Sequence, residues 1–121
     1  MIITVFPGQG SQTPGFLTPW LELDGARERV EQFSSDAGVD LVAAGTEWDA
    51  DRIRDTQVAQ PLIVAASLLS YAALTYAANA TPDGVAGHSV GEIAALVAAG
   101  LVIPADGMRL VGIRGRAMAE A

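Results

Sequence analysis

Gly84-Val85-Ala86-Gly87-His88-Ser89-Val90-Gly91 is the stretch that decides the fold. It is a short apolar run that ends in a G-x-S-x-G pattern, and an apolar segment of helical length follows it as far as Ala99. This order predicts a strand, a sharp turn and a helix. In such a nucleophile elbow the serine occupies a strained turn, and the flanking glycines prevent side-chain clashes. The stretch therefore predicts an α/β fold with an exposed Ser89 hydroxyl.

The position of Ser89 before a helix allows two interpretations. Backbone N–H groups and the helix dipole favour a developing oxyanion at this place, and the N–H of Val90 is the natural first donor. Serine is also a preferred N-cap residue, whose hydroxyl satisfies a free N–H group of the first helical turn. The motif alone leaves a catalytic serine and a plain helix cap both open.

The N-terminal segment predicts a second strand. Residues 2–6 form an apolar, β-branched run that is typical of a fully buried strand, and Pro7-Gly8 ends it. A polar, glycine-rich loop follows up to Gly15. It is no dinucleotide fingerprint because Thr13 stands at the third glycine position, and no phosphate-binding loop because the chain contains no lysine. Two roles remain for this loop: it places backbone N–H groups beside a reacting carbonyl, or it is simply a turn.

The other segments predict helices around these two strands. Residues 24–33 form a polar helix, residues 41–43 a possible helical turn, residues 49–55 a charged exposed stretch, and Pro104 begins a last helix. Residues 58–79 are apolar almost all round, which predicts a central buried helix. Residues 61–80 carry no charge, but we expect no membrane span there, because no basic residue flanks the stretch within several positions. Two strands are few for a parallel sheet, so we expect the 121 residues to be part of a larger protein.

Composition excludes several classes of function. The chain has 121 residues without cysteine, which removes disulfides, Cys-ligated zinc, iron–sulfur clusters and thiol nucleophiles. With His88 as the single histidine we expect no metal site, and we expect no cofactor. The formal net charge of −7 argues against nucleic-acid binding. The N-terminus lacks the basic region of a signal peptide, and the expected location is therefore cytoplasmic.

Arg114 is the second candidate site residue. On a helix, Arg109 and Arg116 share one face, whereas Arg114 lies about 140° round the axis from Arg109 at about 100° per residue. Arg114 can thus point inwards while the other two stay in solvent. A buried guanidinium needs an anionic partner, and its planar fork matches a carboxylate. That partner is either a substrate carboxylate or an internal one such as Glu92, and the sequence leaves both open.

Four motifs in this order resemble a known family. They are Phe6-Pro7-Gly8-Gln9-Gly10-Ser11-Gln12, Gln60-Pro61, Gly87-His88-Ser89-Val90-Gly91-Glu92 and Arg114-Gly115. The combination resembles malonyl-CoA:acyl-carrier-protein transacylases of fatty-acid synthesis and the acyltransferase domains of polyketide synthases. The resemblance covers essentially the whole chain and implies that residues 1–121 are the N-terminal part of the family's large subdomain. It implies an α/β-hydrolase-like parallel sheet core, with the smaller ferredoxin-like subdomain absent from this chain.

The resemblance also implies the roles of individual residues. Ser89 would be the nucleophile that takes the malonyl group from malonyl-CoA, and the N–H groups of Gln9 and Val90 would form the oxyanion hole. Arg114 would bind the malonyl carboxylate, and Gln60 belongs to the same substrate-binding set. The acyl group would then pass to the phosphopantetheine thiol of an acyl carrier protein. Valine after the serine is more typical of the free-standing bacterial enzymes than of the synthase domains.

One expected residue lies outside this chain. The family's general base is a histidine from the later part of the polypeptide, and His88, next to Ser89 in the turn, should point away from its hydroxyl. We therefore expect residues 1–121 alone to show no catalytic turnover. The remainder of the polypeptide is counted among the expected partners. Arg109 and Arg116 are candidates for contacting the acidic carrier protein. The alternatives are an acyltransferase domain of a polyketide synthase, a serine esterase or thioesterase, and a non-catalytic binding fragment.

Overall fold

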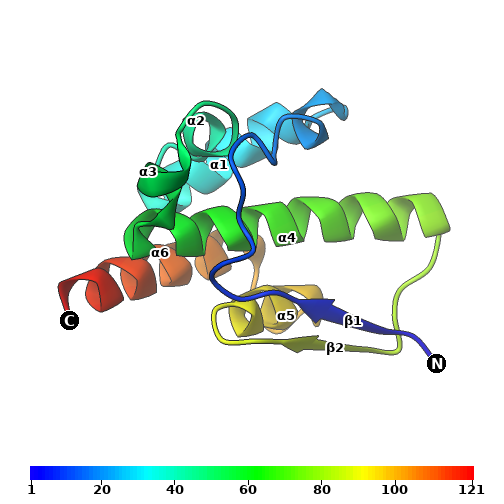
Figure 1. Ribbon diagram of the computed structural model, residues 1–121. Helices are drawn as coiled ribbons and strands as arrows, with labels where there is room; N and C mark the ends of the chain where they lie inside the picture. Colours follow the sequence, from blue (N-terminus) through cyan, green and yellow to red (C-terminus); the bar gives the residue numbers. More distant parts are fainter.

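The computed structural model describes residues 1–121, and it confirms an α/β fold with a small parallel sheet. The long helix α4 (Thr56–Ala78) crosses the middle of the molecule, with helices on one side and the sheet with α5 on the other (Figure 1). The other elements, in chain order, are β1 (Ile3–Phe6), the 3-10 helix η1 (Trp20–Glu22), α1 (Ala26–Ala37), α2 (Leu41–Thr46), α3 (Ala50–Arg54), β2 (Gly84–Gly87), α5 (Gly91–Ala98) and α6 (Pro104–Glu120).

Aspartate caps decide where three of the helices begin. The Asp40 carboxylate accepts from the N–H of Ala43 at the start of α2 (3.1 Å), and Asp55 accepts from the N–H of Gln57 at the start of α4 (3.1 Å). Asp49 caps α3 in the same way. The stretch predicted to be merely charged and exposed therefore contains a short helix, and its Ile53 is 1% exposed in the core.

The core forms around α4, as its apolar sequence predicts. Eleven of its residues, between Val58 and Leu69, are buried. Eight of these eleven belong to a cluster of 22 buried apolar residues drawn from most elements. This helix is long and apolar enough to cross a membrane by length and composition, but 61% of its most apolar 18-residue stretch is buried within the fold. The last turns are different, since Leu74 and Tyr76 are exposed.

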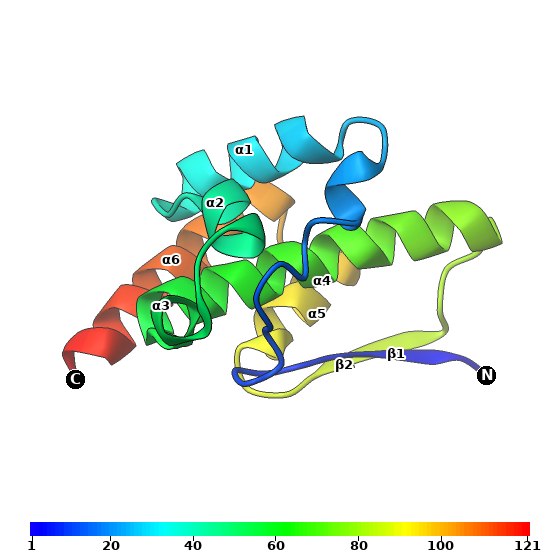
Figure 2. The same cartoon turned by 45° about the horizontal axis from the view of Figure 1, so that its top comes forward.

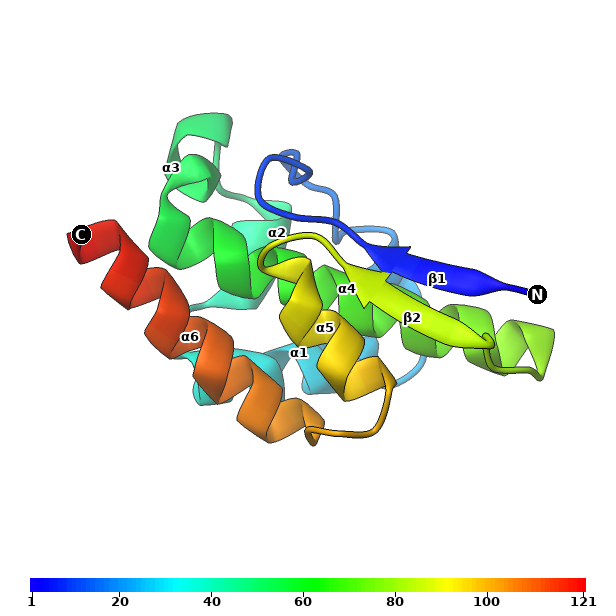
Figure 3. The same ribbon diagram turned by 90° about the horizontal axis from the view of Figure 1, so that it is seen from below.

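The two strands are parallel, and Phe6 pairs with Gly87 at their carboxyl ends. Figure 3 shows the strands side by side, both leading into loops at the same end of the sheet. The prediction that residues 2–6 form a fully buried strand is wrong. Phe6 is buried and packs edge-on against Tyr71 of α4, whereas Val5 is 71% exposed. The sheet has only two strands, with helices on one face, so alternate side chains of β1 stay in solvent.

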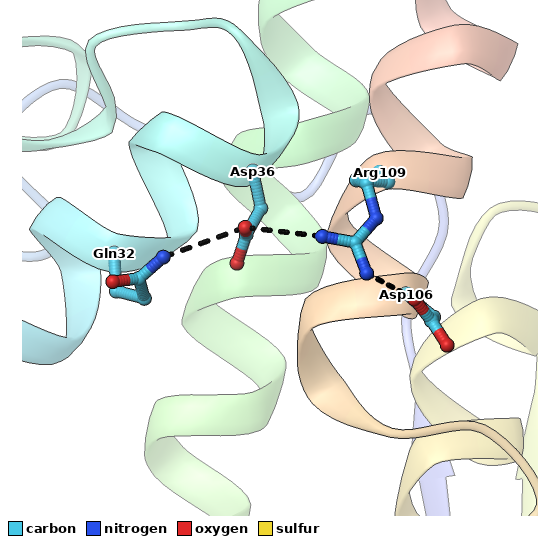
Figure 4. A network of polar contacts seen from close by, with 4 residues as sticks. All are labelled: Gln32, Asp36, Asp106 and Arg109. Atoms are coloured by element: carbon cyan, nitrogen blue, oxygen red, sulfur yellow. Dashed lines mark hydrogen bonds and ion pairs between the residues drawn. The ribbon is translucent and has the colours of Figure 1, made fainter.

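Helix α6 packs against both α1 and α4 (Figure 2). Arg109 and Arg116 do share a face, as predicted, but this face meets α1. Arg109 forms an ion pair with Asp36 of α1 (3.5 Å) and another with Asp106 of its own helix, as Figure 4 shows. The Arg116 guanidinium donates to the carbonyl of Ala37 (3.0 Å). Both arginines therefore tie the two helices together.

Candidate active site

The turn between β2 and α5, residues 87–91, is called the serine corner here. Ser89 is exposed and has a left-handed backbone with φ of 56°, a region that residues with a Cβ rarely adopt. A Cβ on Gly87 would collide with the backbone of Gly91, and a Cβ on Gly91 would collide with the carbonyl oxygen of Phe6. Two glycines are thus required for β1, β2 and α5 to meet this closely.

The hydroxyl of Ser89 is not used by the helix that follows it. The N-cap position of α5 is Val90, and no side chain caps this helix. The first turn is closed instead by backbone bonds, from the N–H of Gly91 to the carbonyl of His88 (3.0 Å) and from the N–H of Glu92 to the carbonyl of Ser89 (3.0 Å). The interpretation of Ser89 as a plain helix cap is therefore wrong, and no backbone group of α5 occupies its hydroxyl.

Two backbone donors accompany this hydroxyl. Gln9 follows Phe6 by three positions and Val90 follows Gly87 by three positions, so the paired strands bring both residues to the same end of the sheet. The backbone N–H groups of Gln9 and Val90 donate to no atom of the chain. Unpaired backbone amides, of which that of Val90 lies at the N-terminus of α5, are suited to bind a negatively charged oxygen.

The glycine-rich loop after β1 is held in place by its own glutamines. The Gln9 side chain donates to the Thr56 hydroxyl at the start of α4 (3.3 Å). The Gln12 side chain accepts from the N–H of Gly10 (2.9 Å) and donates to the carbonyl of Ile53 in α3 (3.3 Å). The loop is therefore anchored to α3 and α4 through side chains, which leaves the backbone N–H of Gln9 unoccupied.

Arg114 of α6 is half-buried and reaches the serine corner. Its Nη1 donates to the Gln60 Oε1 (2.6 Å), and its Nη2 lies 3.5 Å from the Ser89 Oγ. It forms no salt bridge, since the ion pairs of the chain involve only Arg54 and Arg109. The interpretation of Arg114 as half of an internal ion pair is therefore wrong. The hydrogen-bond partners of this cation are a neutral amide and a hydroxyl. A carboxylate ligand would supply the negative charge that these partners lack.

His88 takes no part in this arrangement. It is exposed, and no hydrogen bond joins its ring to the Ser89 hydroxyl. A Cβ at Gly8 would lie 2.9 Å from the His88 Nδ1, so the ring occupies the space beside the glycine-rich loop. This agrees with the prediction that the ring leaves the turn in another direction.

Sequence reasoning did not single out Met118. The Gln60 Nε2 donates to the Met118 Sδ (3.2 Å), which places this sulfur directly behind the amide that holds Arg114. The available signal was its position on α6, because residues i and i+4 of a helix share a face and Met118 follows Arg114 by four. A methionine at such a position is ordinarily assigned to packing.

Parallel strands, long covering helices and an exposed serine at a strand-to-helix turn define an α/β chain with a candidate acyl-transfer site. Residues 3–121 match the model of the acyl transferase domain. The chain is 47% identical over 123 residues to the malonyl CoA-acyl carrier protein transacylase of Mycobacterium tuberculosis, an alignment that covers 100% of this chain and 41% of that protein. The chain belongs to the acyl transferase domain family.

Solved structures agree with this assignment. The crystal structure of the Mycobacterium tuberculosis MCAT superimposes with a TM-score of 0.90 at 47% identity, over 99% of this chain and 40% of that one. A malonyl-transacylase in complex with a type II PKS acyl-carrier protein, PlMCAT:AntF, superimposes with a TM-score of 0.88 at 34% identity, over 98% of this chain and 38% of that one. The chain spans about two fifths of the length of the curated relatives that it matches.

Proposed function

We propose that this chain is the N-terminal part of a malonyl-CoA:acyl-carrier-protein transacylase of fatty-acid biosynthesis. The observation that carries the proposal is the Arg114 guanidinium, which lacks a carboxylate partner and lies 3.5 Å from the Ser89 hydroxyl. A malonyl group esterified to Ser89 would bring its free carboxylate into reach of this cation. The name of the Mycobacterium tuberculosis relative supports the same substrate pair.

In the proposed reaction the serine corner is a nucleophile elbow. The Ser89 Oγ attacks the thioester carbonyl of malonyl-CoA, and its proton passes to a base supplied by the remainder of the polypeptide. The N–H groups of Gln9 and Val90 stabilise the oxyanion that forms. The C–S bond then breaks, the CoA thiolate takes up the proton, and a malonyl ester remains on Ser89.

The second half of the reaction reverses these steps with another thiol. The phosphopantetheine thiol of an acyl carrier protein gives its proton to the same base and attacks the ester, which frees the Ser89 hydroxyl. Without that base a serine is a weak nucleophile, and base assistance contributes roughly 10²–10⁴-fold. We therefore place turnover in the longer polypeptide and not in these residues alone.

Arg114 supplies the specificity in this proposal. Its guanidinium binds the malonyl carboxylate through charge-assisted hydrogen bonds, whereas an acetyl group leaves the cation unpaired. Gln60 is 1% exposed and its Oε1 already accepts from Arg114, so it serves the substrate through the arginine. A serine esterase or thioesterase would need neither residue.

The partners follow from the same chemistry. We propose malonyl-CoA as acyl donor and an acyl carrier protein as acceptor, supported by the carrier protein in the PlMCAT:AntF complex. Arg109 is engaged by Asp36 and Asp106, and Arg116 by the Ala37 carbonyl. We therefore assign the contact with the acidic carrier protein to the remainder of the polypeptide. A cytoplasmic location is part of the proposal, supported by the burial of α4 within the fold.

Replacement of Arg114 tests the proposal. In the complete polypeptide, Arg114→Ala should lower the ratio of kcat/KM for malonyl-CoA to that for acetyl-CoA by about 10²-fold, because the charge-assisted bonds to the malonyl carboxylate are lost. Arg116→Ala is the matched control, since it removes an arginine of the same helix that bonds to Ala37 instead. An unchanged ratio in Arg114→Ala would overturn the transacylase assignment and favour an esterase.

A further inference from the structure

The side chain of Gln60 joins two residues of α6 that have opposite hydrogen-bonding capacities. Gln60 lies in α4 and is 1% exposed. Its Oε1 accepts from the Arg114 Nη1 (2.6 Å), and its Nε2 donates to the Met118 Sδ (3.2 Å). Both ends of a buried amide are thus used by a single neighbouring helix.

These two partners allow only one orientation of the amide. A guanidinium only donates hydrogen bonds and a thioether sulfur only accepts them. Rotation of the Gln60 amide by half a turn would set its NH₂ group against the Arg114 N–H groups and its oxygen against the Met118 sulfur. Met118 therefore fixes the same amide orientation that Arg114 requires, from the opposite end.

The crossing of α4 and α6 brings these groups within bonding distance. A Cβ at Gly115 would lie 3.2 Å from the Cα of Gln57 and 3.3 Å from the carbonyl oxygen of Thr56, closer than most Cβ contacts. Glycine at this position lets α6 pass close to the first turns of α4. Arg114 precedes this contact point and Met118 follows it by three residues, on the face that meets Gln60.

We propose that Met118 is a positioning residue for substrate selection, an inference that rests on the proposed function. Its sulfur holds the Gln60 amide, the amide oxygen holds one nitrogen of the Arg114 guanidinium, and the other nitrogen remains directed toward the acyl group on Ser89. In this proposal Met118 acts through the Gln60 amide and the Arg114 guanidinium. Removing its sulfur leaves a buried N–H of Gln60 without an acceptor, which loosens the support of the arginine.

Met118→Leu in the complete polypeptide tests this inference. We expect the malonyl-to-acetyl ratio of kcat/KM to fall roughly 5- to 20-fold, mainly through a higher KM for malonyl-CoA. Met118→Gln restores an acceptor on a side chain of similar length, and it should recover most of the ratio. Met118 is 47% exposed, so neither variant opens a cavity in the core.

Met108→Leu is the matched control, because it makes the same replacement in the same helix at a fully buried position. It should lower stability and leave the ratio unchanged. A second measurement reports on the contact itself: the ¹⁵N-labelled Gln60 side-chain amide should shift in the NMR spectrum of Met118→Leu and return toward its original position in Met118→Gln.

The outcomes separate the two proposals. If Arg114→Ala lowers the ratio but Met118→Leu keeps it, or if the Gln60 amide resonance does not respond to Met118→Leu, the positioning role is wrong and the transacylase proposal stands. If Arg114→Ala itself keeps the ratio, the proposed function fails, and the role of Met118 in substrate selection fails with it.

Discussion

Ser89→Gly is expected to remove the reactive hydroxyl and to stabilise the fold at the same time. Ser89 has a φ of 56°, and a left-handed backbone costs a residue with a Cβ about 1–2 kcal/mol. Glycine adopts this conformation without steric cost, but it loses more chain entropy on folding, by about 0.5–1 kcal/mol. The mid-range values of these two effects predict a net gain of about 0.7 kcal/mol in the free energy of unfolding.

Comparison with Ser89→Ala isolates the cost of the left-handed backbone conformation. Both variants lose the hydroxyl and its 3.5 Å contact with Arg114, but alanine keeps the Cβ and the strain. Urea denaturation followed by circular dichroism gives the free energies. For a domain of this size the gain of Ser89→Gly over Ser89→Ala corresponds to a rise in Tm of roughly 2–5 °C.

Two further positions calibrate the measurement. Asn79 ends α4 with a φ of 49°, and Asn79→Gly should give a smaller gain, because asparagine tolerates this conformation better than other residues with a Cβ. Ser35→Gly, inside α1, should destabilise by about 0.5 kcal/mol through lost helix propensity. If Ser89→Gly is no more stable than Ser89→Ala while these controls behave as expected, the serine corner is not strained and the reasoning is wrong.

Two other contacts lead to stability predictions that the same denaturation assay checks. Arg109→Ala leaves the carboxylate of Asp36, whose side chain is 10% exposed, without its ion pair and should cost about 1–3 kcal/mol, whereas Asp106→Ala removes a 57% exposed partner and should cost under about 1 kcal/mol. Equal costs would show that the Asp36 pair adds no stability. Gly91→Ala drives a Cβ into the carbonyl of Phe6 and should cost about 1–3 kcal/mol, and a variant as stable as the parent would contradict the close contact.

The sequence was most informative where structure depends on near neighbours. The strand at residues 84–87 and the helix after the serine corner were predicted close to their observed bounds, because glycines mark the turn at both ends. Helix α4 was also predicted closely, since its apolar run is long and Asp55 and Asn79 delimit it. The burial of β1 was predicted wrongly, because a side chain such as Val5 is buried only if another layer covers that face of the sheet.

In the candidate site, too, the residues that local sequence indicates differ from those that depend on how helices pack. Ser89 and the amide of Val90 were found from one local motif, and Arg114 from its place on a helix. Their functional roles remain predictions. The bond between Arg114 and Gln60 joins residues 54 positions apart, and the bond between Gln60 and Met118 joins residues 58 apart. Both depend on how closely α4 and α6 cross, which hydrophobic periodicity does not specify.

The serine and the arginine are held in place by separate contacts, so substitutions at these two places should have different effects. The serine corner is built by contacts among β1, β2 and α5, where glycines such as Gly91 meet backbone carbonyls. The arginine is positioned by a separate contact, the crossing of α6 over α4 at Gly115. The polar connection between these two units is the 3.5 Å contact of Arg114 with Ser89. Substitutions at the α4–α6 crossing should therefore change which acyl group is accepted while the serine keeps its geometry, whereas substitutions in the serine corner should impair every acyl donor alike.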